Sequence, residues 1–173
     1  MAERTARLTP SEEVPLNRER RLAFEVRSQK FGFAVFEGAQ LLDWGIRRAD
    51  SGVTARKIRA LVLQYAPDLA VARRVRRVSS SLHDATEGTM QKIRMELRHN
   101  AVKLVFVERK RIREFFRACG CRNKHQIASR IALDFPVLET MVPKPRKPWD
   151  TEPGATAVFD AVATDIAYLT AIA

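Results

Sequence analysis

Residues 21–38, RLAFEVRSQKFGFAVFEG, decide the fold. Leu22–Val26 and Phe33–Phe36 are short apolar runs typical of buried strands, and the short link between them predicts an antiparallel hairpin. Glu25 lies inside the first run. A carboxylate in a buried strand is costly unless another group pairs with it. We therefore expect Glu25 to have a specific partner.

Strands and helices are predicted on the C-terminal side of this hairpin. A third strand is predicted over Leu41–Ile46, a helix over Val53–Tyr65 and a fourth strand over residues 68–75. After a polar loop over 76–88, the pattern predicts a helix over 90–99, a strand over 102–107, helices over 109–119 and 124–135, an extended proline-rich loop and a last helix over about 153–170. This order predicts an α/β fold with a mixed five-stranded sheet, in which three antiparallel strands are followed by two parallel ones and helices cover both faces.

The composition is that of a folded protein. The 173 residues are 46% hydrophobic and 29% charged, and we expect a single domain over residues 18–173 after a flexible N-terminal tail over residues 1–17. The polar N-terminus lacks the apolar segment of a signal peptide, which predicts a cytoplasmic protein. Cys119, Cys121 and His125 are fewer ligands than a structural zinc site usually has, so we expect no zinc there.

The charge is strongly basic, at +11. A basic body is typical of proteins that bind polyanions, most often nucleic acid, and we favour DNA over RNA. The candidate phosphate contacts are Arg73, Arg74, Arg76, Arg77, Arg109, Lys110, Arg111, Lys144, Arg146 and Lys147. Trp149 follows the last of these in the proline-rich loop. We expect it to anchor the loop to the core, and the alternative is that it stacks on an unpaired base.

Several short motifs resemble those of the RuvC-like Holliday junction resolvases, a branch of the RNase H-like superfamily. They are Glu25 in the first strand, Gly32-Phe33-Ala34-Val35 in the second, LLDWGIR over 41–47, Pro67-Asp68, and Asp160-Ala161-Val162 in the last helix. The resemblance spans roughly residues 21–171. It implies a Mg²⁺- or Mn²⁺-dependent endonuclease that acts as a homodimer on branched or structured DNA in recombination. Glu25 and Asp160 would be catalytic metal ligands, with Asp165 as a further metal ligand.

The sequence departs from the acidic pattern of this family. Glu25 replaces the usual Asp, Arg73 and Arg74 stand where an acid should follow the fourth strand, and Ala157 stands where the last helix should carry another acid. Glu152 is interpreted as a charge that favours the start of the last helix, with metal binding as the alternative.

These departures leave other functions open. Arg73 or Arg74 could neutralise Glu25 in a metal-free ion pair. The first alternative is therefore a degenerate RNase H-like module that binds DNA or RNA without cleaving it. The second is an accessory protein that uses its basic faces against nucleic acid or an acidic partner.

Overall fold

The computed structural model describes residues 19–50, 52–75, 81–147 and 149–172, so the predicted phosphate contacts Arg76 and Arg77 lie outside the described residues. The strands are β1 (Arg20–Val26), β2 (Lys30–Glu37), β3 (Gln40–Arg48), β4 (Leu69–Arg73) and β5 (Lys103–Val107). The helices are α1 (Thr54–Tyr65), α2 (Ser81–His99), α3 (Arg109–Ala118), α4 (Lys124–Asp134), the 3₁₀ helix η1 (Pro136–Met141) and α5 (Thr156–Ile172). None of the described helices is both long and apolar enough to span a membrane.

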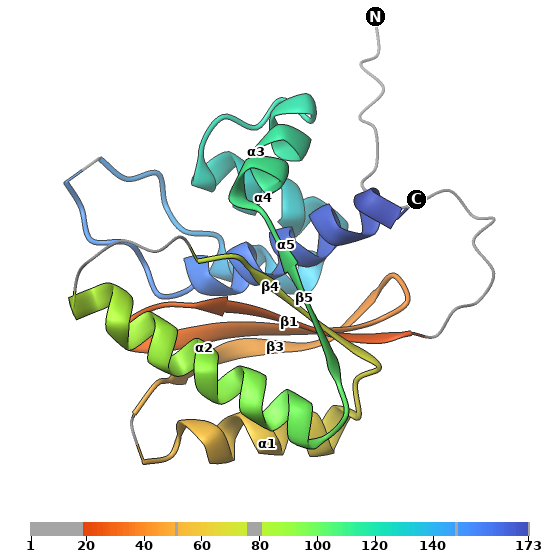
Figure 1. Ribbon diagram of the computed structural model, residues 1–173. Helices are drawn as coiled ribbons and strands as arrows, with labels where there is room; N and C mark the ends of the chain where they lie inside the picture. The colour runs from red at the N-terminus through yellow and green to blue at the C-terminus, as the bar shows by residue number, and fades with distance from the viewer. Residues whose placement is uncertain (1–18, 51, 76–80, 148, 173) are drawn as a thin grey trace, which may run out of the picture.

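The five strands form one mixed sheet in the order β3-β2-β1-β4-β5. β1 and β2 pair antiparallel, as do β2 and β3, whereas β4 runs parallel to both β1 and β5. Helices α1 and α2 lie on one face of the sheet, and α3, α4 and α5 lie on the other (Figure 1). The predicted fold class is therefore confirmed, including its three antiparallel and two parallel strands.

The alternation of side chains along β1 points Glu25 towards α5. Leu22, Phe24 and Val26 belong to the apolar cluster that packs against α1 and α2. Ala23 belongs to the cluster that contains the apolar residues of α5. Because successive side chains of a strand point to opposite faces, Glu25 lies on the α5 side with Ala23.

The start of α5 sits directly on this part of the sheet. Gly32 pairs with Glu25 across the β1–β2 hairpin, and a Cβ atom on Gly32 would lie 2.3 Å from the carbonyl oxygen of Ala157. Such a contact is too close for any side chain, so only glycine allows α5 to approach β2 here. Ala157 is itself fully buried against Gly32, which leaves no space for an acid at that position.

Three sequence predictions about local structure were wrong. Residues 81–88 are not a loop, because α2 begins at Ser81. Residues 84–88 are exposed or half-buried, so they need no apolar stripe, and Asp84 favours the helix start. The segment after α4 is not extended throughout, since η1 buries Leu138. Finally, α5 begins at Thr156 rather than near Pro153.

Candidate functional site

The partner of Glu25 is Arg73. The two residues end the neighbouring parallel strands β1 and β4, where Phe24 pairs with Ala72. The Arg73 guanidinium donates from Nε to Oε2 at 2.9 Å and from Nη2 to Oε1 at 2.5 Å. Glu25 is only 1% exposed, and burial raises its pKa although the hydrogen bonds and charge of Arg73 act in the opposite direction. The planar guanidinium of Arg73 thus donates hydrogen bonds to both carboxylate oxygens of Glu25.

A second set of ion pairs surrounds this one. Arg27 follows Glu25 by two residues and donates to Glu152 at 2.5 Å and to Asp160 at 2.8 Å. Lys124, the first residue of α4, contacts the same two carboxylates and lies 2.9 Å from Asp160. Burial opposes ionisation of Glu152, but the hydrogen bonds from Lys124 and Arg27 outweigh it and lower its pKa. Glu152 is therefore held ionised by Lys124 and Arg27.

Asp165 is not part of this group. It accepts two hydrogen bonds from Arg21, from Nε at 2.9 Å and from Nη2 at 3.0 Å. Arg21 lies four residues before Glu25 on β1, which is about 13 Å along a strand. Burial raises the pKa of Asp165, against the effect of Arg21. The structure therefore brings Glu25 and Asp160 together but places Asp165 in a separate buried ion pair.

These residues do not fit a divalent metal. Mg²⁺ binds oxygen ligands at near-octahedral geometry and needs carboxylates that can turn towards it. Both oxygens of Glu25 and of Glu152 already accept hydrogen bonds from cationic side chains, and Oδ2 of Asp160 accepts two. Across the part of the chain that the structure describes, no group of three or more His, Cys, Asp or Glu side chains could hold a metal ion.

A large cleft opens beside these ion pairs, at the carboxyl ends of β1 and β4. Its volume is about 830 Å³. Eight basic and four acidic side chains line it: Arg27, Arg73, Arg74, Arg109, Lys110, Arg113, Arg117 and Lys124, with Glu25, Glu108, Glu114 and Glu152. The excess of cations makes the cleft electropositive.

The excess charge comes from one face of α3. Arg109, Arg113 and Arg117 are spaced four residues apart and line the cleft together; we call them the α3 arginine stripe. Within the described residues none of the three makes an ion pair or a hydrogen bond through its side chain. Burial, together with the neighbouring charges of Arg113 and Arg73, lowers the pKa of Arg109. This crowding of like charges favours the binding of an anion.

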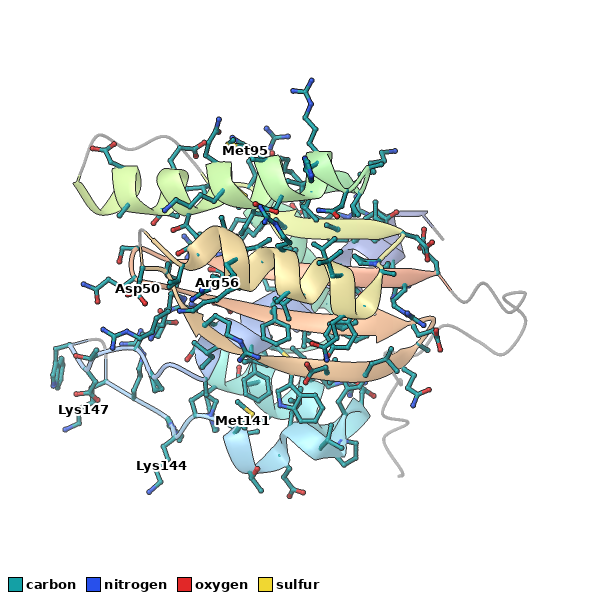
Figure 2. The ribbon with its side chains drawn as sticks, turned by 90° about the horizontal axis from the view of Figure 1, so that it is seen from below. Asp50, Arg56, Met95, Met141, Lys144 and Lys147 are labelled. Carbon is teal, nitrogen blue, oxygen red and sulfur yellow. The ribbon has the colours of Figure 1, made fainter. Side chains whose placement is uncertain are left out.

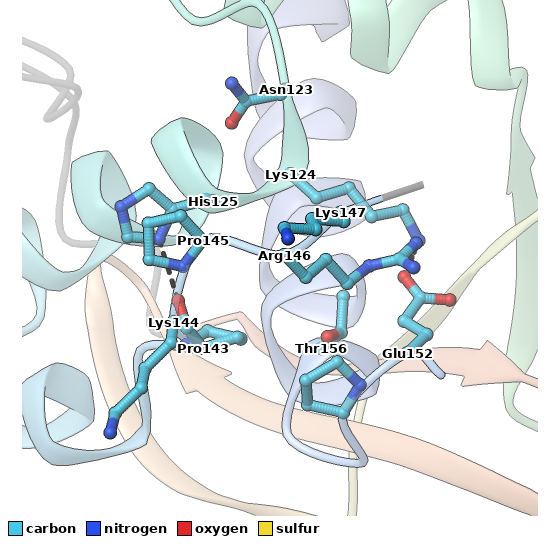
Figure 3. Close-up of a pocket in the computed structure, with 11 residues that line it drawn as sticks. Asn123, Lys124, His125, Pro143, Lys144, Pro145, Arg146, Lys147, Glu152 and Thr156 are labelled. Atoms are coloured by element: carbon cyan, nitrogen blue, oxygen red, sulfur yellow. Dashed lines mark hydrogen bonds and ion pairs between the residues drawn. The ribbon is translucent and has the colours of Figure 1, made fainter. Parts of the chain in front are cut away.

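The other predicted phosphate contacts are distributed more widely. Arg74 and Lys110 line the cleft, where they pair with Glu108 at 2.6 Å and with Glu114 at 3.7 Å. Arg111 points elsewhere, since its Nε donates to the carbonyl oxygen of Ala167 on α5 at 3.2 Å. The remaining three contacts line a separate, smaller pocket (Figure 3); they are Lys144, Arg146 and Lys147.

No family model matches the chain, and no curated protein sequence matches it. Several solved structures do match the chain. Thermus thermophilus RuvC in complex with a Holliday junction substrate superposes with a TM-score of 0.66 at 12% identity, over 87% of this chain and 92% of that one. The chain has a RuvC-like fold. RuvC from the same organism in a second structure gives a TM-score of 0.63 at 10% identity, over 87% of this chain and 93% of RuvC. The yeast mitochondrial Holliday junction resolvase Ydc2 gives 0.59 at 8% identity, over 94% of this chain and 83% of Ydc2.

Sequence reasoning missed several residues of this candidate site. Arg27 could have been found, because it follows Glu25 by two residues, directly after the end of β1, and an extended chain points such a residue to the same face. Arg117 continues the four-residue spacing of Arg109 and Arg113, which is also visible in the sequence. Lys124 gave no such signal, because only the packing of α4 beside α5 brings it to the carboxylates.

Proposed function

We propose that this protein binds branched or structured DNA in the cleft between β1, β4 and α3, and that it does so without metal-dependent cleavage. One observation carries the proposal: the α3 arginine stripe, which has no ion-pair partner among the described residues, lines a cleft whose carboxylates are already paired with other cations. The stripe is then free to contact phosphates. Phosphate contacts of this kind supply most of the affinity of proteins for DNA irrespective of sequence.

The fold supports DNA as the polyanion. One structure with the same fold is a RuvC complex with a Holliday junction, a branched DNA. A protein that contacts phosphates on several arms of such a substrate needs charge spread over an open surface rather than a narrow pocket. The cleft has a volume of about 830 Å³, and its cations come from the carboxyl end of β4, from α3 and α4, and from Arg27 directly after β1.

The paired carboxylates support binding without cleavage. Cleavage by the two-metal mechanism requires carboxylates that hold metal ions against the scissile phosphate. Here Arg73 occupies the end of β4, where the family resemblance calls for an acid, and it binds Glu25 directly. The guanidinium compensates the buried charge that a metal would otherwise compensate. It also keeps the carboxylate from repelling an incoming phosphate.

Binding to a labelled four-way junction should depend steeply on salt. We expect log K to fall linearly with log salt concentration, with a slope of about −2.7 or steeper for three or more phosphate contacts. Fluorescence anisotropy titrations at about 50 to 300 mM NaCl measure this slope, because phosphate contacts weaken over this range of salt concentration. Absence of binding, or binding that does not change with salt, would contradict the proposal and favour the accessory-protein alternative.

A further inference from the structure

The proline-rich loop between η1 and α5, described over residues 142–147 and 149–155, exposes a tryptophan. Trp149 is 77% exposed, the highest value for any large hydrophobic side chain in the described residues. The prediction that it anchors the loop to the core is therefore wrong. Lys144 and Lys147 project from the same loop at the edge of the molecule (Figure 2). An aromatic ring that is kept away from the core, among cations, is available to a ligand.

A hydrogen-bonded turn holds Trp149 outward. The backbone N–H of Asp150 donates to the carbonyl oxygen of Lys147 at 3.1 Å. In return, the Asp150 carboxylate accepts from the backbone N–H of Lys147 at 2.9 Å. The guanidinium of Arg146 donates to the Asp150 carbonyl oxygen. These bonds connect Asp150, the residue after Trp149, to Lys147 and Arg146, and the Trp149 ring beside them is exposed.

Basic side chains of the loop line a pocket that shares two of its lining residues with the main cleft. The pocket has a volume of about 280 Å³, and Lys144, Arg146 and Lys147 line it together with Lys124 (Figure 3). Its only carboxylate among the described residues is Glu152. Lys124 and Glu152 also line the main cleft. A nucleic acid strand bound in the cleft can therefore continue into this pocket and reach Trp149.

We infer that the loop binds an unpaired nucleotide, with Trp149 stacked on the base and the basic side chains of the pocket on the flanking phosphates. The ammonium of Lys147 lies 5.5 Å from the centre of the Trp149 ring, so one loop presents both an aromatic surface and a phosphate ligand. Only an unpaired base offers a free face, because paired bases are stacked within the duplex. Stacking of this kind tolerates any base. The inference rests on the proposed function and adds a preference for substrates with unpaired bases.

Trp149→Ala is expected to weaken binding to a duplex that carries a short single-stranded bulge by roughly 5- to 150-fold. Affinity for the same duplex without the bulge should stay within about twofold, because only the stacked base is lost. Trp149→Phe keeps an aromatic face and should retain most of the affinity for the bulged duplex. Fluorescence anisotropy with the two labelled DNAs measures all three proteins, and circular dichroism shows that each variant is folded.

Tryptophan fluorescence gives a second readout. In a Trp44→Phe background, Trp149 is the only tryptophan of the chain, and stacking should quench its emission on addition of the bulged duplex but not of the intact one. Equal losses of affinity for both DNAs in Trp149→Ala, or no loss for either, would overturn the inference while leaving the proposed function intact. Absence of binding to either DNA by the unmodified protein would overturn both.

Discussion

Arg73→Met is expected to lower the free energy of unfolding by roughly 3–5 kcal/mol at neutral pH, which is the range for removing one partner of a buried ion pair. The substitution leaves the aliphatic part of the side chain but removes the guanidinium that covers both oxygens of Glu25. Glu25 is almost completely buried, so the substitution leaves a buried carboxylate without its main partner. Chemical denaturation followed by circular dichroism measures the change.

The loss should shrink as the pH falls. Burial raises the pKa of Glu25 above 4.5, its value in the unfolded chain, and removal of Arg73 raises the pKa further. The folded variant then binds the proton more tightly than the unfolded chain does. Stability is therefore highest below the unfolded pKa and falls as the pH rises through the folded pKa. Denaturation at about pH 5 and at about pH 8 should therefore show the larger loss of stability at pH 8.

Two variants control this experiment. Arg74→Met removes a neighbouring arginine whose ion pair with Glu108 is exposed, and it should change stability little. Adding Glu25→Gln to Arg73→Met removes the uncompensated charge and should recover much of the loss. An unchanged stability of Arg73→Met, or a loss of the same size at pH 5 and pH 8, would show that Arg73 is not the partner on which Glu25 depends.

Neutralising the α3 arginine stripe should abolish most of the DNA affinity. Changing Arg109, Arg113 and Arg117 to Gln removes up to three phosphate contacts, so the log–log salt slope should become shallower by about 2.7. At 0.1 M salt this corresponds to a loss of roughly several hundred-fold in affinity. The three side chains lack ion-pair partners in the described structure, so the folded state should tolerate the change. Anisotropy titrations with a four-way junction measure both quantities.

A matched variant carries the same change in charge at three residues that do not line the cleft. Arg56 on α1 (Figure 2), Arg98 on α2 and Lys103 at the start of β5 are exposed, and changing them to Gln also removes three positive charges. If the DNA affinity and the log–log salt slope of this variant fall as much as those of the stripe variant, net charge rather than the cleft determines binding.

The fold was predictable from the sequence because its signals are local. The apolar runs at Leu22–Val26 and Phe33–Phe36, with a short link between them, are sufficient to predict the hairpin. The start of α2 was missed because its first turns are polar and exposed, which makes them resemble a loop. Hydrophobic periodicity reports only the part of a helix that packs against the core.

The site was only partly predictable because ion pairs are made in three dimensions. The need of Glu25 for a partner follows from its place in an apolar strand, and Arg73 was one of two candidates. Asp165 was predicted as a further metal ligand although it lies five residues after Asp160 and is rotated off that face of the helix. Arg21, on the same face of β1 as Glu25, pairs with it instead. The sequence shows which residues are charged, but only packing decides which charges meet.

Cleavage of a bound four-way junction tests the central claim most directly. The measurement uses protein in excess over labelled junction, at a salt concentration where anisotropy shows the junction fully bound, in Mg²⁺ and separately in Mn²⁺. The account predicts that the junction stays intact in both metals, because Glu25, Glu152 and Asp160 are paired with Arg73, Arg27 and Lys124. Metal-dependent cleavage that disappears in Glu25→Gln would contradict it and restore the endonuclease that the family resemblance implies.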